Sequence, residues 1–174
     1  MNTDKHRYIH IWENTFGWSG LMYSPRGAKV FTFGEASRGK AENYLMKFVA
    51  SEQQVIKESR IQSRLAGEIR EIDDYFSGNT VKFNIPFDLA EYSSFYRRVW
   101  SVVAGIPYGK TASYGEIARR VGVPGGARAV GMAMAANPLP VLVPCHRVVR
   151  SDGSLGGYSR GLRWKKRLLE LEKK

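Results

Sequence analysis

Residues 113–136 read SYGEIARRVGVPGGARAVGMAMAA. The hydroxyl of Ser113 and the carboxylate of Glu116 have the spacing of a capping box, which predicts the start of a short helix. The glycine-rich segment 122–126 should break this helix, and a second short helix should run to Ala136. Two short helices joined by a glycine-containing turn are typical of a helix-turn-helix, although many helical hairpins bind nothing.

The second of these helices carries unusually small side chains. Its small residues are Ala127, Ala129, Gly131, Ala133, Ala135 and Ala136, and Arg128 stands at its start. A helix of this kind can enter a narrow groove, and minor-groove proteins insert an arginine in this way. The alternative is that the small residues permit close packing against a neighbouring helix.

The chain before this region has the pattern of a small α/β domain. The expected elements are strands at 7–12, 16–24 and 28–33, helices at about 40–50 and 59–76, and a further strand at 81–85. We therefore expect an α/β domain over residues 1–85, a β-sheet with helices, in a supporting role. Residues 86–174 should form a mainly α-helical domain that opens with a helix at about 89–104 and contains a winged-helix-like helix-turn-helix.

The charge of the chain is unevenly distributed. The 174 residues carry a formal net charge of +11, and 43% of them are hydrophobic, as in a globular protein. Residues 91–174 hold 15 Lys and Arg against 5 Asp and Glu. This excess indicates a polyanionic partner such as nucleic acid, or else a solubilising surface.

Targeting and metal-binding signals are not found in the sequence. The N-terminus has no continuous apolar segment of a signal peptide, and no apolar run is long enough to span a membrane. One cysteine cannot form an internal disulfide, and no cluster of Cys and His offers a zinc site. We expect a soluble, cytoplasmic monomer without membrane contact, metal or cofactor.

The single cysteine lies in the tetrapeptide Pro144-Cys145-His146-Arg147. The thiolate is the reactive form of cysteine, and neighbouring cations lower the pKa of a thiol toward neutrality. The tetrapeptide thus predicts a nucleophile that His146 and Arg147 help to ionise. The alternative is a buried structural cysteine, which is the more common role of a free thiol.

Several motifs between Phe95 and Glu172 carry a family resemblance. They are Ile106-Pro107-Tyr108-Gly109, Ser113-Tyr114, Ala127-Arg128-Ala129-Val130-Gly131, Asn137-Pro138, Pro144-Cys145-His146-Arg147-Val148 and Gly156-Gly157-Tyr158. In this order and spacing, the region resembles the O6-alkylguanine-DNA alkyltransferases, also called methylated-DNA–protein-cysteine methyltransferases. The resemblance covers nearly half of the chain, and the N-terminal half matches only in general character.

The resemblance implies DNA repair by direct reversal. The expected reaction is the irreversible transfer of a methyl or alkyl group from O6 of guanine, and less well from O4 of thymine, to Cys145. The partner is double-stranded DNA that contains O6-alkylguanine, to which the protein would be bound in the nucleoid. The nucleotide is flipped out first, each molecule reacts once, and no cofactor takes part.

The resemblance also implies roles for the catalytic residues. Cys145 is the acceptor, His146 is the general base that reaches the thiol through a water, and Glu172 orients the histidine. Tyr114 donates a proton to purine N3, and Asn137 braces the turn that carries the cysteine. On a helix from about residue 161, Glu172 falls on the same stripe as Leu162, Leu168 and Leu169.

Further residues are expected to bind the DNA and the flipped base. Arg128, Ala127, Ala129 and Tyr114 would contact DNA. The pocket for the base would be formed by Met134, Pro140, Val148, Tyr158, Ser159 and Arg160. Arg160 replaces the glycine of many family members and should narrow the mouth of the pocket. Arg147 would hold the two domains together through a carboxylate. Some relatives bind zinc near the N-terminus, where this chain has only His6 and His10, so no metal is expected.

Two other classes of protein compete with this interpretation. An alkyltransferase-like protein has the same fold but lacks the cysteine and only marks the lesion, so Cys145 argues against it. A helix-turn-helix transcription factor would explain the charge, but it needs base-reading polar residues on a helix that here is mostly alanine.

Overall fold

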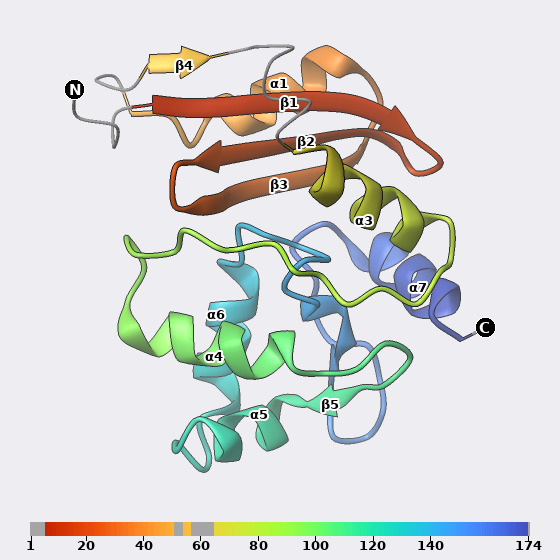
Figure 1. Ribbon diagram of the computed structural model, residues 1–174. Coiled ribbons are helices and arrows are strands. Elements are labelled where there is room, and N and C mark those ends of the chain that lie inside the picture. The colour runs from red at the N-terminus through yellow and green to blue at the C-terminus, as the bar shows by residue number, and fades with distance from the viewer. Residues whose placement is uncertain (1–5, 51–53, 57–64, 174) are drawn as a thin grey trace. The chain divides into compact units, whose positions relative to one another are not determined.

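The computed structural model describes residues 6–50, 54–56 and 65–173. The chain divides into two compact units, one ending at Asp88 and the other beginning at Leu89. Figure 1 labels all but η2 and β6 of the following elements. Their bounds are β1 His6–Asn14, β2 Gly17–Ser24, β3 Gly27–Glu35, α1 Arg38–Met46, β4 Gln54–Ile56, α3 Ala66–Phe76, α4 Ser94–Ala104, β5 Ala112–Ser113, α5 Tyr114–Arg120, α6 Ala127–Ala135, η2 Cys145–Arg147, β6 Val148–Val149 and α7 Leu162–Leu171. The expected fold class is confirmed, with a sheet and helices first and a mainly helical part after it.

The first unit is built on a sheet with the strand order β3-β2-β1-β4. Its first three strands are antiparallel neighbours, as the alternating sequence predicts, and β4 runs parallel to β1. The side-chain oxygen of Asn14 accepts a hydrogen bond from the backbone N–H of Phe16 at 3.0 Å. The next residue, Gly17, has a φ of 104°, so this tight turn uses the conformational freedom of glycine.

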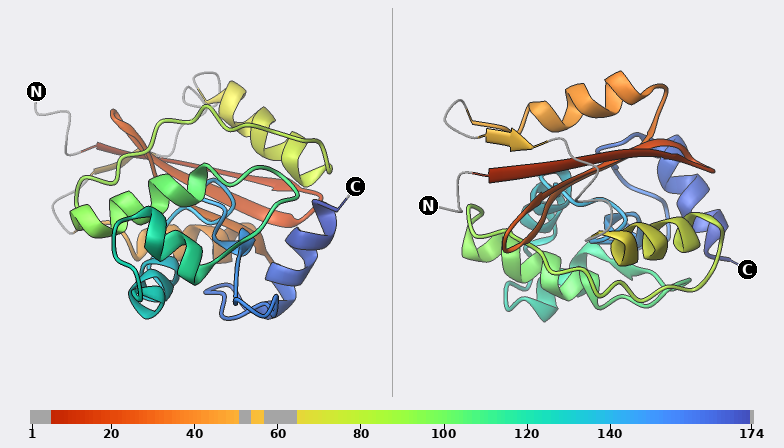
Figure 2. Two further views of the ribbon diagram at one scale, coloured as in Figure 1. Left: turned by 90° about the horizontal axis from the view of Figure 1, so that it is seen from below. Right: turned by 45° about the horizontal axis from the view of Figure 1, so that its top comes forward.

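One helix covers each face of the sheet (Figure 2). On the first face, α1 packs into an aliphatic cluster that consists of Ile9, Ile11, Met22, Val30, Ala41 and Leu45. On the second face, Phe76 of α3 stacks on Phe16 with ring centroids 4.5 Å apart. The indole N–H of Trp12 donates to Asp73 of α3 at 2.9 Å, which satisfies a polar group within this aromatic layer.

Three predicted elements of the first unit differ in the structure, and strand β4 was not predicted. The helix expected at 40–50 is α1, Arg38–Met46, because Ser37 caps it and accepts from the N–H of Lys40. The helix expected at 59–76 is described as α3, and residues 59–64 lie outside the described part of the chain.

The predicted strand at 81–85 is wrong. Only one isolated parallel bridge forms here, between Ala28 and Phe87. The carbonyl of Pro86 accepts from the N–H of Ala28 at 2.8 Å, but a proline has no N–H with which to extend a ladder.

The end of the first unit is held against the turn between β2 and β3. The carboxylate of Asp88 accepts from the Ser24 hydroxyl at 2.6 Å and from the Arg26 guanidinium at 3.2 Å. The backbone N–H of Asp88 donates to Ala28 at 2.9 Å. These bonds explain why the unit extends beyond residue 85.

The second unit begins with α4 and the two helices of the helix-turn-helix. The helix expected from residue 89 starts at Ser94, because Ser93 accepts from the N–H of Tyr96 at 3.2 Å. The predicted capping box is present at α5: the Ser113 hydroxyl accepts from the N–H of Glu116, whose carboxylate accepts from the N–H of Ser113.

An aromatic side chain of α4 forms a hydrogen bond with helix α6 and holds it in place. Trp100 of α4 is buried, and its indole N–H donates to the backbone carbonyl of Ala133 in α6 at 2.8 Å. The short strands β5 and β6 pair in parallel through Ala112 and Val148. This pairing joins the start of the helix-turn-helix to the segment that follows Cys145.

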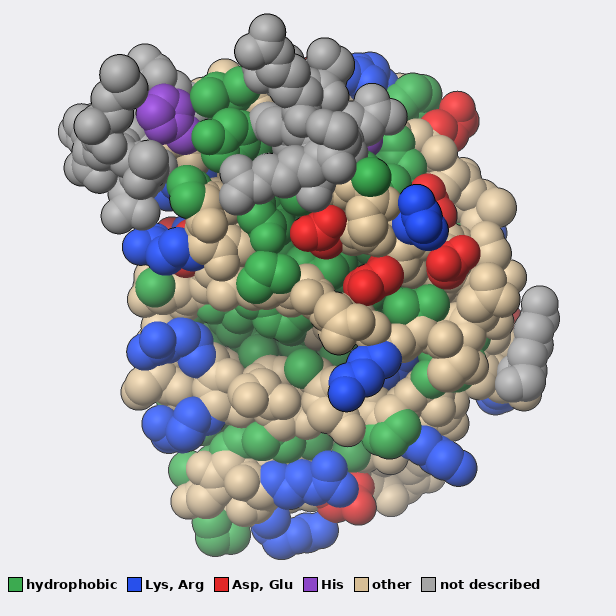
Figure 3. Space-filling model, viewed as in Figure 1, with side chains coloured by type: hydrophobic (Ala, Val, Ile, Leu, Met, Phe, Trp, Pro, Cys, Tyr) green, Lys and Arg blue, Asp and Glu red, His purple; other side chains and the backbone are tan. Residues whose placement is uncertain are grey.

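The face of the second unit that Figure 3 shows is basic. In the face shown in Figure 3, Lys and Arg side chains spread over α4 and α5 with few acidic side chains among them. Among the described residues, no helix is long and apolar enough to cross a membrane.

A substitution at Gly27 tests the contact that ends the first unit. Gly27 has a φ of 145°, and a Cβ there would lie 2.4 Å from the carbonyl oxygen of Pro86. We expect Gly27→Ala to lower the free energy of unfolding by more than about 1 kcal/mol, measured by urea denaturation. Gly39→Ala is the control, because nothing lies within 4 Å of its Cβ position in α1. An unchanged Gly27→Ala protein would show that the contact does not constrain this turn.

Candidate active site

A constrained loop leads from α6 to the cysteine. Val141 is fully buried and has a φ of 77°, a conformation that β-branched residues rarely adopt. The side-chain N–H group of Asn137 donates to the carbonyl of Val143 at 3.0 Å, while its oxygen accepts from the N–H of Leu139 at 3.0 Å. Asn137 therefore holds the loop at both ends.

The thiol of Cys145 is enclosed by this loop. Only 2% of the residue is exposed, and the side-chain N–H group of Asn137 donates to its sulfur at 3.1 Å. Burial raises the pKa of the Cys145 thiol to about 11, although the Asn137 hydrogen bond and the charge of Lys165 act in the opposite direction. The expectation that His146 and Arg147 would ionise the thiol is therefore wrong for the protein without DNA, because both side chains are directed to Glu172.

Glu172 is the common partner of three groups. Its carboxylate lies 2.7 Å from Nε2 of His146 and accepts from Nε of Arg147 at 2.9 Å. It also accepts from the backbone N–H of Gly109 at 3.1 Å. Glu172 is 3% exposed, so this buried carboxylate is compensated by hydrogen bonds and charge rather than by water.

His146 is a neutral base at physiological pH. Burial lowers the pKa of its imidazole, and the hydrogen bond and charge of Glu172 only partly offset this effect. Because the carboxylate of Glu172 can only accept, the short bond places the imidazole proton on Nε2. The remaining ring nitrogen, Nδ1, is then the one that can accept a proton.

The role expected for Arg147 is wrong. Its guanidinium donates to Glu172 and, at 2.6 Å, to the carbonyl of Ile106. Both partners belong to the second unit, so Arg147 braces the active site itself instead of joining the two domains.

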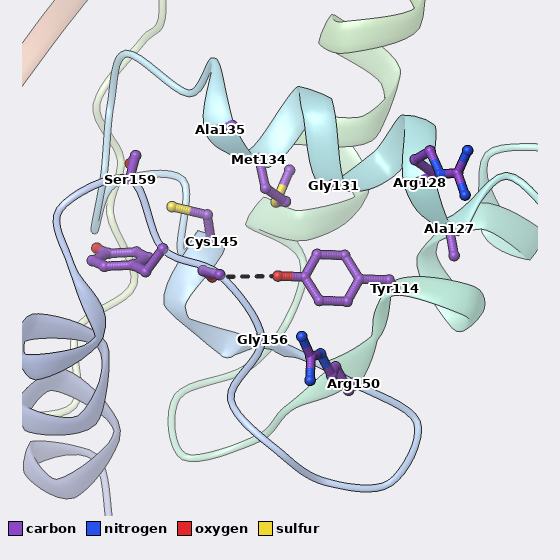
Figure 4. Close-up of a pocket in the computed structure, with 12 residues that line it drawn as sticks. Tyr114, Ala127, Arg128, Gly131, Met134, Ala135, Cys145, Arg150, Gly156 and Ser159 are labelled. Carbon is purple, nitrogen blue, oxygen red and sulfur yellow. Dashed lines mark hydrogen bonds between the residues drawn. The ribbon is translucent and has the colours of Figure 1, made fainter.

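A cavity of about 500 Å³ opens over the thiol. Its lining residues are Tyr114, Ala127, Arg128, Gly131, Met134, Ala135, Cys145, Arg150, Gly156, Gly157, Tyr158 and Ser159. Figure 4 shows the Cys145 side chain and the Tyr114 hydroxyl facing the same hollow, with Met134 of α6 above them. Ala127 and Arg128 lie farther along α6, beyond Tyr114 (Figure 4).

The cavity brings together six of the ten residues expected to bind DNA or the base. Met134, Tyr158 and Ser159 line it, but Pro140, Val148 and Arg160 do not. The backbone explains two of these three differences. Val148 is fully buried in β6, where it pairs with Ala112, and Pro140 forms a bridge with Val143.

Arg160 and Ala129 are the remaining residues that were expected at the site and do not line the cavity. Arg160 is half-buried and does not line the cavity itself, but its charge acts on the lining residue Tyr158. Ala129 is also half-buried, and it does not line the cavity as Ala127 and Arg128 do.

Two tyrosines line the cavity together with the thiol. The Tyr114 hydroxyl donates to the carbonyl of Gly157 at 3.4 Å, a long hydrogen bond shown dashed in Figure 4. Burial raises the pKa of Tyr114, and a charge on Cys145 raises it further. Burial likewise raises the pKa of Tyr158 well above its usual value, with the same effect of Cys145. Both phenols are therefore protonated donors at neutral pH.

Two basic residues of the site were missed in the sequence. Arg150 lines the cavity and is placed by a turn in which its N–H donates to the carbonyl of Ser154 at 2.8 Å. Lys165 is fully buried on α7. Its position, three residues before Leu168 and seven before Glu172, is on the same helical stripe, and this spacing was the available signal. Leu162, which was assigned to the stripe, is 53% exposed.

The N-terminal histidines show no metal-binding arrangement. His10 stacks on Trp12 with ring centroids 5.4 Å apart. In the part of the chain that the structure describes, no group of three or more His, Cys, Asp or Glu could hold a metal ion.

Known proteins share this sequence and fold. Residues 94–174 match the family described as 6-O-methylguanine DNA methyltransferase, DNA binding domain. The chain is 50% identical over 109 residues to a protein of Mycolicibacterium paratuberculosis named methylated-DNA–protein-cysteine methyltransferase. It is 51% identical over 108 residues to the protein of that name from Mycobacterium leprae. These matches span 62–63% of this chain and 65–66% of the relatives.

Solved structures match almost the whole chain. The crystal structure of Mycobacterium tuberculosis OGT in complex with DNA is 34% identical, covers 97% of this chain and 92% of that one, and superposes with a TM-score of 0.76. The O6-methylguanine-DNA methyltransferase of Pyrococcus kodakaraensis is 26% identical with a TM-score of 0.67. The chain combines a helix-turn-helix with a buried cysteine at its site. These two features define its class, DNA-binding proteins with a cysteine at the site. The chain belongs to the 6-O-methylguanine DNA methyltransferase family.

Substitution of Glu172 tests whether its carboxylate holds the site together. Glu172→Gln would leave the buried Arg147 guanidinium without a charged partner, and breaking a buried pair in this way costs about 3–5 kcal/mol. We expect a loss of this size in the free energy of unfolding, measured by urea denaturation. Glu170→Gln is the control, since that exposed residue is 3.8 Å from Lys166 and should change the stability by less than about 0.5 kcal/mol. Equal effects of the two variants would contradict the central role of Glu172.

Proposed function

We propose that this protein repairs DNA by moving a methyl or alkyl group from O6 of guanine, and less well from O4 of thymine, to the sulfur of Cys145. The observation that carries the proposal is the position of the thiol at the base of a cavity walled by α6 of the helix-turn-helix. The names of the relatives, methylated-DNA–protein-cysteine methyltransferase, and the DNA complex of the Mycobacterium tuberculosis protein support it. The protein would act in the cytoplasm, as a monomer and without a cofactor.

The transfer is a displacement at carbon. The thiol loses its proton, the sulfur attacks the methyl carbon, and the bond between this carbon and O6 breaks with its electron pair going to guanine. The products are a thioether on Cys145 and an unmodified guanine, so no further reactant is needed. A thioether has no proton to lose and is a much weaker nucleophile than a thiolate. Because the chain has no second cysteine, each molecule reacts once.

The His146–Glu172 pair would remove the proton from the thiol. His146 is neutral, and Glu172 fixes the tautomer that leaves Nδ1 as the acceptor. As the imidazole becomes positive, the Glu172 carboxylate stabilises it, as in other nucleophilic triads. Asn137, which donates to the sulfur, stabilises the thiolate in the same step.

Tyr114 would assist the departure of guanine. Negative charge develops on the base as the carbon–oxygen bond breaks, and a phenol can donate to purine N3 at this moment. The Tyr114 hydroxyl faces the same hollow as the thiol (Figure 4), and its raised pKa keeps the proton available.

Arg128 would separate the target base from its duplex. The O6 atom lies inside the stacked helix, so the nucleotide must be extruded at a cost of a few kcal/mol. Arg128 is exposed at the start of α6, where a guanidinium can fill the space that the base leaves. The small residues behind it, Ala127 and Ala129, would let the helix approach the minor groove.

The second candidate is a lesion-binding protein without transfer activity. Such a protein would share the helix-turn-helix and the cavity, and its site would need no nucleophile. The presence of Cys145, enclosed with Asn137 and backed by His146 and Glu172, favours transfer.

Measurement of methyl transfer from DNA decides between these candidates. We expect mass spectrometry to find one added methyl group per protein molecule, on Cys145, after incubation with excess duplex that contains O6-methylguanine. Cys145→Ser should gain none and should bind the duplex with nearly unchanged affinity. More than one guanine repaired per protein molecule, or a methylated Cys145→Ser protein, would contradict the single-use mechanism.

Two substrates separate the role of Arg128 from the chemistry. Arg128→Ala should repair a methylated duplex at least about tenfold more slowly, since extrusion costs a few kcal/mol and each 1.4 kcal/mol is a factor of ten. It should react with a free O6-alkylguanine base at the rate of the unchanged protein, because that substrate needs no extrusion. Arg163→Ala, an exposed arginine of α7, is the control for loss of charge. Equal losses on both substrates would place Arg128 in the chemistry or the folding of the site.

A further inference from the structure

Lys165 is a buried cation in the wall of the site. It is fully buried on α7, although lysine is almost never buried without a partner. Its Nζ donates to the carbonyls of Val148 at 2.6 Å and Gly157 at 3.2 Å, and also to the carbonyl of Leu155. The three protons of the ammonium are thus matched by three backbone oxygens.

These three oxygens are neutral, so the charge of Lys165 is not compensated by them. No carboxylate of the described residues forms an ion pair with Lys165. Glu172, which lies on the same helix, already binds Arg147 and His146. A buried charge without a counter-charge is costly, and its presence in a site usually has a functional reason.

The group that can supply the missing charge is Cys145. The buried and half-buried groups that can carry charge on the elements around Lys165 are Tyr114 and Glu116 on α5, Cys145, His146 and Arg147 on η2, Tyr158 and Arg160 in the loop after β6, and Glu172. The exposed ones are Arg119, Arg120, Arg150, Asp152, Arg163, Lys166, Arg167 and Glu170. Glu116 accepts from the backbone of Ser113 in the capping box. The two tyrosines remain protonated, and Glu172 is bound to Arg147. Ionisation of the thiol therefore creates the negative charge that Lys165 otherwise lacks.

We infer that the Lys165 ammonium is the electrostatic partner of the Cys145 thiolate, and that its hydrogen bonds hold the cavity wall in place. The inference rests on the proposed function of Cys145 as the nucleophile. It assigns to Lys165 a positioning role, since the lysine stays protonated and transfers nothing. The charge of Lys165 lowers the pKa of the thiol, and a charge on Cys145 raises the pKa of Lys165, which burial lowers to about 8.

The same lysine connects the thiol to the residue that assists the leaving group. The carbonyl of Gly157 accepts from Lys165 and also from the Tyr114 hydroxyl. Nζ lies 5.8 Å from the centroid of the Tyr114 ring, within range of a cation–π interaction. Gly156, Gly157, Tyr158 and Ser159 line the cavity, so the bonds of Lys165 to Leu155 and Gly157 fix this part of its wall.

The test measures the ionisation of the thiol without DNA. Thiolate absorbance and the rate of alkylation by iodoacetamide are followed against pH for the intact protein, for Lys165→Met and for Lys166→Met. We expect Lys165→Met to reduce alkylation roughly tenfold below about pH 8, where Lys165 of the intact protein is charged, because loss of this charge raises the pKa of the thiol by about one unit. Lys166→Met should have no effect, because Lys166 is exposed on the next position of α7. An unchanged profile in folded Lys165→Met would overturn the inference.

A reciprocal measurement keeps the test valid if Lys165→Met does not fold. Lysines of Cys145→Asp and of Cys145→Ser are labelled by reductive ¹³C-methylation and titrated by NMR. The carboxylate of Cys145→Asp carries the charge that the thiolate would have, so the pKa of Lys165 should be higher in this variant than in Cys145→Ser. An identical Lys165 titration in both proteins would overturn the inference.

The two measurements also distinguish the inference from the proposed function. Neither of them uses methylated DNA, so a coupled thiol and lysine in a protein that transfers no methyl group would refute only the proposed function. Uncoupled groups in an active methyltransferase would refute only the role of Lys165.

Discussion

The carboxylate of Glu172 organises the second unit. It binds the imidazole of His146, the guanidinium of Arg147 and the backbone of Gly109, and so joins α7, η2 and the turn after α4 at one point. Arg147 extends this connection to the carbonyl of Ile106. Because a buried carboxylate is stable only when it is fully compensated, the positions of these elements are coupled. The orientation of the base next to the thiol follows from this coupling.

The enclosure of Cys145 has two consequences for its chemistry. Burial keeps the thiol protonated in the protein without DNA, which protects it from oxidants and other electrophiles, since these react with the thiolate. The same enclosure strengthens every charge interaction inside the site. A neutral His146, a donating Asn137 and a buried Lys165 can therefore act together when the substrate is in place.

Local sequence patterns predicted the elements whose stability is local. The capping box of Ser113 and Glu116 and the alternating β1 belong to this group. Predictions failed where the result depends on a distant partner. The segment 81–85 alternates like a strand, but only Phe87 reaches a neighbouring strand, at Ala28.

The residues of the candidate site also divide into those that the local sequence reveals and those whose role depends on distant partners. Cys145 and His146 were predicted from their tetrapeptide and Glu172 from the family resemblance, but the effect of burial on the thiol required the surrounding loop. Val148 follows the motif in sequence, yet its pairing with Ala112 turns it away from the cavity. Lys165 was overlooked because a lysine on a stripe of leucines is normally exposed, and its three acceptors come from segments that the helix alone does not reveal.

Because Trp100 contacts α6, its intrinsic fluorescence is a probe of the position of this helix. The indole donates to the carbonyl of Ala133 inside the helix that would enter the groove, and Tyr92 packs edge-on against it at 4.8 Å. Indole emission depends on the polarity and hydrogen bonding around the ring. With Trp12, Trp18 and Trp164 replaced by phenylalanine, the wavelength of the remaining emission would report any displacement of α6 as a duplex binds, in real time and without an added dye.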